Sequence, residues 1–234
     1  MNGKTVAIIP ARGGSKRILH KNKKIFNGKP LIEWTIDAAC QSELVDYIVV
    51  SSDDEQILEI AAKFNKVICV KRPVELATDT ASINDAVRHA IDELSSLNVE
   101  VEHLVLLQPP CPLKTTEDVN NAIALYHQGK YGSVVSVTEV EHPIDYSMTL
   151  DNKEILDDFY VHLKNIPARS QDFGKEYRLN GVIYITSIAS FMENNTVFNA
   201  PGRAFIMPGS RSVDIDLPID FAIAEALAQY KEEE

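Results

Sequence analysis

The chain has only three cysteines among its 234 residues, and the three are scattered along the sequence. An odd and scattered set offers neither a disulfide framework nor the ligand spacing of a zinc site, and it is typical of a reducing compartment. The sequence also shows no signal peptide and no run close to the ~20 apolar residues of a membrane-spanning helix. We therefore expect a cytoplasmic protein that neither crosses a membrane nor depends on disulfide bonds.

Several catalytic signatures are missing as well. The sequence has no Gly-x-Ser-x-Gly nucleophile elbow, no Gly-x-Gly-x-x-Gly dinucleotide fingerprint and no Walker loop, because Gly13–Lys16 lacks the required spacing. Its six histidines lack the close helical pairing of zinc sites. A net charge of −11 disfavours a nucleic-acid partner, which requires a basic face. These absences count against an ATPase, a zinc enzyme and a nucleic-acid-binding protein.

Positive charge is nevertheless concentrated near the amino terminus. Eight of the 23 basic residues lie within the first 32 positions, which contain no Asp or Glu. They surround the glycine-containing turn Pro10–Lys16, which directly follows the apolar run Val6–Ile9. A polyphosphate is held by free backbone N–H groups, by glycine that permits close approach and by neutralising Lys and Arg side chains. The pattern indicates a polyphosphate site, and a solvated basic loop is the alternative.

Strand-like and helix-like segments alternate along the chain. Apolar and β-branched runs predict strands at residues 6–9, 47–51, 67–70, 103–107, 133–137, 182–185, near 204–207 and at 213–215. Helical spacing and cap residues predict helices at residues 31–40, 56–64, 82–97, 115–127 and from Pro218 onward. Repeated βα units predict an α/β protein with a mainly parallel, twisted sheet and helices on both faces. We expect residues 1–234 to form a single domain.

Three polar turns come directly after predicted strands. They are the basic loop, Ser51–Asp54 and Gln108–Pro112. In parallel α/β sheets, ligands bind at the carboxyl ends of the strands. We therefore expect these three turns to face one crevice.

The regular alternation breaks at residues 139–175. This stretch is polar, contains Pro143 and Pro167, and has a hairpin-like turn at Asp151-Asn152. A long structureless loop inside a domain would be unusual. We interpret the stretch as an insertion outside the main sheet, an arm or lid that is a candidate for dimer contacts.

Asp214 and Asp216 form the most suggestive acidic pair. Residues two apart in a strand point to the same side, so the two carboxylates would repel one another unless a cation lay between them. Mg²⁺ prefers hard oxygen ligands and typically takes one or two carboxylates together with phosphate oxygens. The pair predicts a metal site beside the basic loop, and helix capping before Pro218 is the alternative.

Arg178–Tyr184 is a second candidate segment. Arg178 offers a planar fork for a carboxylate or phosphate, but it could equally form a surface salt bridge. Asn180 could be a turn residue before Gly181, and Tyr184 could belong to the core. The segment alone does not decide between these interpretations.

As a set, the motifs resemble those of the CMP-sialic acid synthetases, also called acylneuraminate cytidylyltransferases, nearly from end to end and in the same order. The matching segments are Ile8–Lys16, Lys21-Asn22, Asn27–Ile32, Ser51–Asp53, Arg72–Ser82, Gln108-Pro109 with Pro112-Leu113, Arg178–Tyr184 and Asp214–Pro218.

The resemblance implies a Rossmann-like nucleotidyltransferase fold with a small dimerisation arm, and hence a homodimer. It implies an enzyme that takes CTP and a nonulosonic acid, a nine-carbon 2-keto-3-deoxy sugar acid, to the CMP-sugar and pyrophosphate with Mg²⁺. N-acylneuraminate is the first substrate to consider. In the implied mechanism the anomeric hydroxyl of the sugar attacks the α-phosphorus in line and pyrophosphate leaves, so that catalysis consists mainly of positioning and charge neutralisation.

The same resemblance implies a role for each matching residue. The triphosphate would be held by Arg12, Gly13, Ser15 and Lys21, with Lys21 close to the α-phosphate and Asn22 sharing in nucleotide binding. Positions near the cytidine are matched by Arg72 and Ser82, and positions of the sugar pocket by Gln108, Arg178, Asn180 and Tyr184. Asp214 and Asp216 match the metal-binding pair, and the expected catalytic residues are Lys21, Asp216 and Arg12.

Departures from the family pattern bear on the sugar. A basic position of the family is acidic here, at about Asp145, and a second family arginine would fall on Ser170, beside Arg169. Because both positions belong to the substrate side, the departures count against N-acetylneuraminate itself. Legionaminic acid, another bacterial relative or the eight-carbon acid Kdo stays open. A non-catalytic nucleotide-binding domain would need a damaged site, whereas the phosphate-binding and acidic residues are all present.

Overall fold

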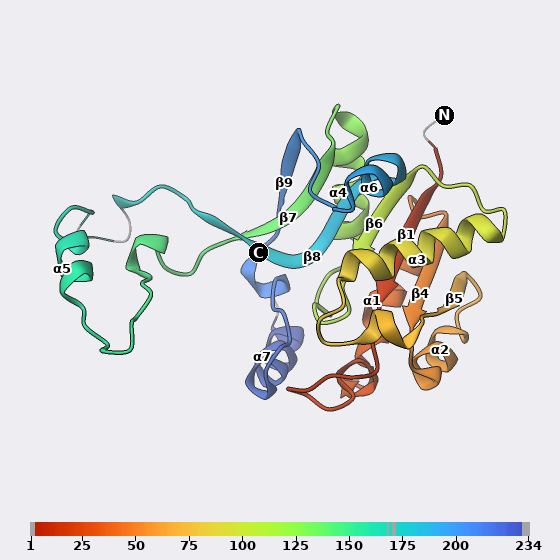
Figure 1. The fold of residues 1–234 in the computed structure, drawn as a ribbon, viewed down its shortest axis with the longest axis horizontal. Helices are drawn as coiled ribbons and strands as arrows, with labels where there is room; N and C mark the ends of the chain where they lie inside the picture. The colour runs from red at the N-terminus through yellow and green to blue at the C-terminus, as the bar shows by residue number, and fades with distance from the viewer. Residues whose placement is uncertain (1–2, 168, 170–171, 231–234) are drawn as a thin grey trace.

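A seven-stranded sheet forms the centre of the computed structural model, which describes residues 3–167, 169 and 172–230 (Figure 1). From one edge to the other the strands are β5 (Val67–Lys71), β4 (Tyr47–Ser52), β1 (Thr5–Pro10), β6 (His103–Leu107), β8 (Tyr177–Ser187), β7 (Ser133–Glu139) and β9 (Gly202–Ile206). Every neighbouring pair is parallel except the two pairs that β8 forms, with β6 and with β7. The sheet is therefore mainly parallel, as the repeated βα units predicted.

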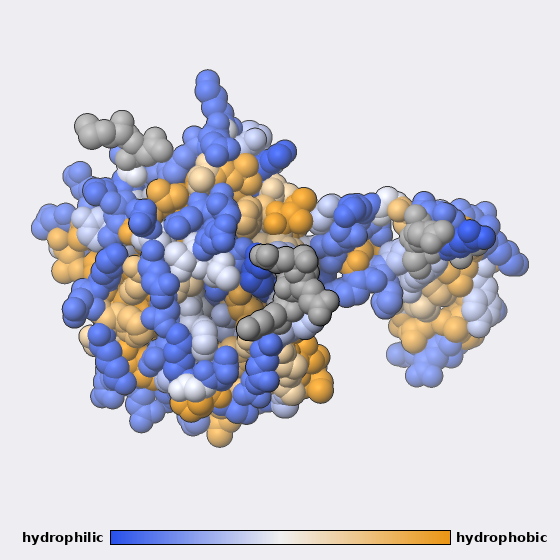
Figure 2. Space-filling view, turned by 180° about the vertical axis from the view of Figure 1, so that it is seen from behind, coloured by the Kyte–Doolittle hydropathy of each residue, from blue (hydrophilic) through white to orange (hydrophobic). Residues whose placement is uncertain are grey.

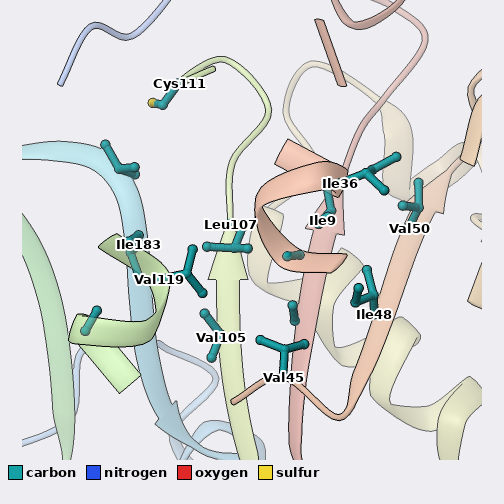
Figure 3. Close-up of a cluster of buried hydrophobic side chains, with 14 of the residues drawn as sticks. Ile9, Ile36, Val45, Ile48, Val50, Val105, Leu107, Cys111, Val119 and Ile183 are labelled. Carbon is teal, nitrogen blue, oxygen red and sulfur yellow. The ribbon is translucent and has the colours of Figure 1, made fainter. Parts of the chain in front are cut away.

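Helices cover both faces of this sheet. On one face lie α1 (Leu31–Cys40), α2 (Glu55–Ala61) and α4 (Thr116–Gln128), and on the other lie α3 (Ile83–Ser96) and α6 (Ile188–Asn194). Figure 3 shows part of the first layer, where Ile9 and Leu107 of adjacent strands pack near Ile36 and Val119 of the covering helices. Strands buried on both faces read as continuous apolar runs, which is why the central strands were easy to predict.

A third apolar cluster joins the two ends of the chain. It contains Ile18, Phe26 and Leu31 from the amino-terminal part and Ile215, Phe221 and Ala224 from the carboxyl-terminal part. Phe26 belongs to the short β2–β3 hairpin (Ile25–Phe26 and Lys29–Pro30), Leu31 directly follows it, and Phe221 belongs to α7 (Pro218–Gln229). Burying each large side chain is worth about 1.5–3 kcal/mol. The cluster therefore fixes α7 beside the basic loop, at the same end of the sheet (Figure 1).

Side-chain caps begin three of the helices where the sequence predicted helix starts. Asp54 accepts from the backbone N–H groups of Gln56 and Ile57 at the start of α2, and Ser82 accepts from that of Asn84 at the start of α3. Thr115 and Asp118 form a reciprocal capping box at the start of α4. Each such cap is worth about 1 kcal/mol. The caps hold these helix starts in place after strands β4, β5 and β6.

Three expectations about element bounds need correction. Residues 213–215 form no strand: the segment is extended, but it pairs with no neighbour in the sheet. The helix predicted at 56–64 ends at Ala61, and the strand predicted at 182–185 is only part of the 11-residue β8. None of the described helices is long and apolar enough to span a bilayer.

The residues between β7 and β8 leave the sheet and form an extension that projects from the rest of the molecule (Figure 1). The extension contains the short turn Ile144–Tyr146 and the helix α5 (Asp157–Leu163). At its base, Arg178 donates to Glu141 at 2.9 Å and Lys175 to Glu139 at 3.0 Å. These pairs join the outgoing and returning chains. We call residues 140–176 the arm.

A pair of histidines lies near the start of β6. The ring of His103 contacts that of His127, in the last turn of α4, with centroids 4.8 Å apart, and it also contacts Tyr126. Partial burial lowers the pKa of both histidines, and for His103 the proximity of His127 lowers it further. Both rings are therefore held in the neutral form, and protonation opposes the packing of α4 on the sheet.

Acidification should weaken the fold through this pair. In the folded protein the pKa values of both histidines lie below the value of about 6.5 that they have in the unfolded chain. The contribution of the neutral rings to the free energy of unfolding is therefore complete above about pH 6.5. It is lost as the pH falls through the pKa values of the folded protein. We expect thermal unfolding followed between about pH 8 and 5 to show a smaller acid-induced fall in Tm for His127→Gln than for the wild type. His142→Gln, which changes an exposed histidine of the arm, is the control and should follow the wild type. Parallel curves for all three proteins would contradict the prediction.

Candidate functional site

The turns that follow β1 and β6 border a crevice at the carboxyl ends of these strands, whereas the turn after β4 supports the basic loop through Asp53 and Asp54 and does not line the crevice. Two adjoining cavities of about 330 and 270 Å³ share Arg12, Ser15, Lys21 and Asp79 in their walls. The first is lined mainly by charged side chains of the basic loop together with Asp216, and the second reaches toward Arg72 and Gln108. The crevice is therefore a polar site with a cationic end.

The basic loop is held in place by backbone contacts. The N–H of Gly13 donates to Asp53 at 3.0 Å, and the side chain of Asn22 donates to the carbonyl of Arg12 at 3.0 Å. A Cβ atom at position 13 would lie 2.8 Å from the side chain of Asp54, so the close approach of the loop to this helix cap requires glycine. Lys23 pairs with Asp54 at 2.6 Å. These contacts fix the loop that carries Arg12, Ser15 and Lys16.

Lys21 connects the basic loop to the carboxyl-terminal acidic segment. Its Nζ donates to the carbonyl of Ile215 at 2.5 Å and lies 3.2 Å from Oδ1 of Asp216, although 194 and 195 residues separate the partners in the sequence. Arg17 reaches the other carboxylate oxygen of Asp216, also at 3.2 Å. The structure thus brings together the cations and the acidic pair that the sequence analysis placed in one site.

The acidic segment is anchored by its middle residue. Ile215 is fully buried in the third apolar cluster, and its N–H donates to the carbonyl of Pro110 at 2.9 Å. Asp214 and Asp216 therefore flank a buried side chain, although the segment is not the strand that was predicted. Desolvation by the surrounding protein and the charge of Asp216 raise the pKa of Asp214, although the residue as a whole is exposed. The two carboxylates thus lie close enough to repel one another.

The second cavity brings together the residues expected near the nucleoside. Arg72 is only 5% exposed and donates to the carbonyl and the hydroxyl oxygen of Ser51, at 2.7 and 3.2 Å. Burial and the nearby Arg12 lower the pKa of this guanidinium, while Asp53 opposes the shift. Ser82 and Asn22 also line the cavity. Asn22 is 6% exposed, and its buried Oδ1 has no hydrogen-bond partner among the described residues.

The four residues expected in the sugar pocket do not all line the same cavity. Gln108 lines the second cavity, and its side chain interacts with the phenol of Tyr184, which is mostly buried between β6 and β7. Arg178 lies at the base of the arm with Glu141, within electrostatic reach of Asp214. Asn180 is 2% exposed and bonds two serines inside the protein. Its amide is therefore engaged inside the protein, and a place for Asn180 in the sugar pocket stays a prediction.

Both departures noted in the sequence fall within the arm, and the structure describes the one at Asp145. Asp145 lies in the turn Ile144–Tyr146 and pairs with His162 of α5, with 3.1 Å between the carboxylate and Nε2. Ser170 lies outside the described residues.

Three residues of the site were not assigned a role from the sequence. Asp79 pairs with Arg12 at 3.0 Å and also contacts Lys16, so it neutralises two cations of the basic loop. Arg17 lines the first cavity beside Lys21. Asp79 stands in the matching segment Arg72–Ser82, so its position there was an available signal, whereas Arg17 belongs to the local basic excess and directly follows the Gly13–Lys16 run.

The third residue, Lys114, does not line either of these two cavities but supports the turn after β6. It is fully enclosed, and its Nζ donates to the carbonyls of Gln108 and Cys111 and to the hydroxyl of Thr35, at 2.9, 2.6 and 2.8 Å. Burial lowers its pKa to about 8. The three bonds tie the turn after β6 to α1, and this turn carries Gln108 into the cavity. No sequence pattern distinguished Lys114 from a surface lysine.

Comparison with known proteins agrees with this geometry. Residues 6–231 match the family model described as cytidylyltransferase. The chain is 33% identical to a CMP-N,N'-diacetyllegionaminic acid synthase of Legionella pneumophila, over 97% of both chains. It is 35% identical to a pseudaminic acid cytidylyltransferase of Campylobacter jejuni, over 98% of both chains. It is also 35% identical to an N-acylneuraminate cytidylyltransferase of Escherichia coli, where it spans 99% of its own length and 54% of the relative.

Solved structures support the fold. A CMP:2-keto-3-deoxy-manno-octonic acid synthetase, solved in complex with CTP, superposes with a TM-score of 0.69 over 96% of this chain and 98% of that one, at 17% identity. At this identity the likeness concerns the fold alone, which is a Rossmann-like nucleotidyltransferase fold as expected. The match to the family model over nearly the whole chain, together with relatives above 30% identity, shows that the protein belongs to the cytidylyltransferase family and is a nucleotidyltransferase.

Proposed function

We propose that the protein transfers the cytidylyl group of CTP to the anomeric hydroxyl of a bacterial nonulosonic acid, forming the CMP-sugar and pyrophosphate. The single observation that carries the proposal is the contact of Lys21 with Asp216 and Ile215, which joins a cationic cavity to a carboxylate pair. A triphosphate needs cations along its length and neutralisation at the phosphorus that is attacked. The crevice offers both within one site.

The proposed nucleotide site extends across both cavities. The triphosphate lies in the cavity lined by Arg12, Ser15, Lys16 and Lys21, and the nucleoside lies in the adjoining one. Asn22 lines the nucleoside cavity and supports it indirectly, because its amide donates to the carbonyl of Arg12 at 3.0 Å. The buried guanidinium of Arg72 supplies a rigid donor on the same side.

The carboxylates suit Mg²⁺. Asp214 and Asp216 provide hard oxygen atoms close to the proposed phosphate site, and the described residues hold no group of three or more His, Cys, Asp or Glu that would form a complete protein cage. Mg²⁺ characteristically completes such a site with phosphate oxygens and water. When bound, it would neutralise phosphate charge and lower the pKa of the attacking hydroxyl.

The protein's own residues orient the attack. Lys21 stabilises negative charge that develops at the α-phosphate, and Arg12 holds the leaving pyrophosphate. Asp216 restrains Lys21 through its Oδ1, and Ile215 restrains it through its carbonyl. The sugar hydroxyl then attacks the α-phosphorus from the side opposite the leaving group, and catalysis depends chiefly on this alignment.

The sugar acid is the finer part of the proposal. The relatives from L. pneumophila and C. jejuni carry the names of legionaminic and pseudaminic acid, and they match the chain over nearly their whole length. Together with the acidic Asp145 in the arm, this favours a legionaminic-type or pseudaminic-type acid over N-acylneuraminate. Kdo is the less favoured alternative, because its synthetase is similar to this chain in fold at only 17% identity.

A homodimer is the proposed assembly. The arm exposes several large apolar side chains, among them Ile155, Tyr160 and Val161, and Figure 2 shows apolar surface gathered on it. An apolar groove of about 360 Å³ lies beside the edge strand β9, and Val137 and Phe198 are among the residues that line it. Exposed apolar patches of this kind mark interaction sites, and a second copy of the chain would cover both.

Pyrophosphate release should identify the substrate. We expect CTP and Mg²⁺ to give rapid release with legionaminic or pseudaminic acid, and at least about tenfold lower kcat/KM with N-acetylneuraminate or Kdo, since a polar mismatch in a sugar pocket costs more than about 1.4 kcal/mol. A coupled phosphate assay measures this. Tight CTP binding without release for any of the four acids would refute the proposed activity.

Removing the carboxylate of Asp216 should abolish turnover without unfolding the protein. Asp216→Ala loses both the partner of Lys21 and one oxygen donor of the metal pair, so we expect kcat to fall at least about 100-fold. Tm should stay near the wild-type value, because Asp216 is exposed. Glu43→Gln, which changes an exposed acidic residue far from Asp216 in the sequence, serves as the control. An active Asp216→Ala enzyme would exclude the metal role.

Charges placed on the arm should dissociate the dimer. Tyr160→Glu combined with Val161→Glu puts two carboxylates on the exposed face of α5, and light scattering should then report a monomer. Leu97→Glu changes an equally exposed apolar residue at the end of α3 and should leave the dimer intact. A wild-type monomer, or a dimer that survives the double change, would contradict the proposed interface.

A further inference from the structure

Strand β7 carries a bulge where it runs beside β8. The bulge lies in the β7–β8 ladder: Val135 pairs with Tyr184 and Val137 with Leu179, so residues 180–183 of β8 face the single residue Ser136. On β8, Gly181 adopts a φ of 75°, a left-handed conformation that favours glycine. Bulges next to functional sites commonly redirect side chains. Here the irregularity turns the side chains of Ser136 and Asn180 toward one another.

A buried chain of hydrogen bonds fills this bulge. The hydroxyl of Ser136 donates to Oδ1 of Asn180 at 2.6 Å and accepts from the N–H of Ile183 at 2.8 Å. The amide of Asn180 donates to the hydroxyl of Ser212 at 2.9 Å, and Ser212 donates in turn to the carbonyl of Pro208 at 2.8 Å. The three polar side chains are 0–2% exposed, so each bond has a defined geometry and no water competes for it.

The outer end of this chain lies next to the acidic segment. Ser212 stands two residues before Asp214, and the residues from 212 to 216 form no ladder with the sheet. On the other side of Asp214, Ile215 is held by Pro110 and by burial. The Asn180–Ser212 bond therefore links the sheet to the amino-terminal flank of Asp214, which Arg211 also ties to Asp118 of α4 at 2.9 Å. Gly181 lies under the same carboxylate, with only 3.7 Å between an added Cβ and Oδ2 of Asp214.

We propose that Ser136, Asn180 and Ser212 are positioning residues that set the Asp214 carboxylate against Asp216 for a divalent cation. The inference rests on the proposed function, because it assumes that the acidic pair binds a metal together with CTP. It assigns to Asn180 a role through Ser212 rather than contact with the sugar. Two mutually repelling carboxylates stay at a fixed spacing only if the backbone on both sides is restrained.

A second buried network on the same strands provides a matched control. Ser133 of β7 exchanges hydrogen bonds with the backbone of Asn199, and Asn199 donates to Thr186 of β8. Ser133 is as buried as Ser136 and lies three residues away, at the opposite end of β7 from the acidic segment. A purely structural role would make the two serines equivalent.

The experiment measures Mn²⁺ binding to the CTP complex of the full chain, without sugar acid, from the electron paramagnetic resonance signal of free Mn²⁺. We expect Ser136→Ala and Ser212→Ala to weaken Mn²⁺ binding about 3- to 10-fold, as the loss of one hydrogen bond implies. Ser133→Ala should lower Tm by a similar amount but change Mn²⁺ binding less than about twofold. In turnover, kcat should fall in the first two variants while KM for CTP stays close to the wild-type value.

The outcomes separate the inference from the proposed function. Equal Mn²⁺ affinity in all three serine variants and the wild type would overturn the inference alone. A wild-type chain that binds neither CTP nor Mn²⁺ would overturn the proposed function and the inference with it. If Ser212→Ala failed to fold, Ser212→Cys would replace it, because the thiol keeps the volume but bonds more weakly. Its Mn²⁺ affinity must then fall between those of the wild type and Ser136→Ala, and any other order counts against the proposal.

Discussion

The contact of Lys21 with Asp216 and the carbonyl of Ile215 is the constraint on which the site depends. Without it, eight basic residues would lie near one end of the chain and the two carboxylates near the other. Like charges within each group would then repel one another without compensation. Lys21 is largely buried, so its charge needs the acceptors that the acidic segment provides. The apolar cluster of Ile18, Phe26 and Ile215 holds the two segments together beneath the contact. Packing brings the ends together, and electrostatics determines which atoms face the crevice.

The cations of the crevice are partly neutralised by the protein itself. Asp79 pairs with Arg12 and Lys16, and Asp216 pairs with Lys21 and Arg17. All four pairs include an exposed partner, and exposed ion pairs are worth at most about 1 kcal/mol. A triphosphate, with several charges and many acceptor oxygens, can therefore take over these cations at small cost. The same carboxylates keep the loop ordered, which lowers the conformational cost of binding.

The central sheet could be predicted from the sequence, because strands buried on both faces give unbroken apolar runs. The starts of three helices could be predicted as well, because Asp54, Ser82 and Thr115 cap them. It did not reveal that β8 is antiparallel, since strand direction depends on the path of the arm rather than on local pattern. Asn180 looked like a turn or a ligand residue, because nothing in Arg178–Tyr184 shows that Ser136 and Ser212 lie on either side of its amide. Asp216 lies beside the cations of the basic segment as expected, although a loop and not a strand carries the acidic pair.

The second cavity and the arm are built under different constraints. The cavity lies at strand ends and helix caps, where Ser51 holds the guanidinium of Arg72 and Ser82 begins α3. The arm is held at its base by exposed ion pairs, and none of its described residues belongs to the three apolar clusters. Surface segments of this kind tolerate substitution better than the elements they connect. On the proposed function, a fixed site for CTP can therefore coexist with a variable choice of sugar acid wherever the arm contributes to the sugar side.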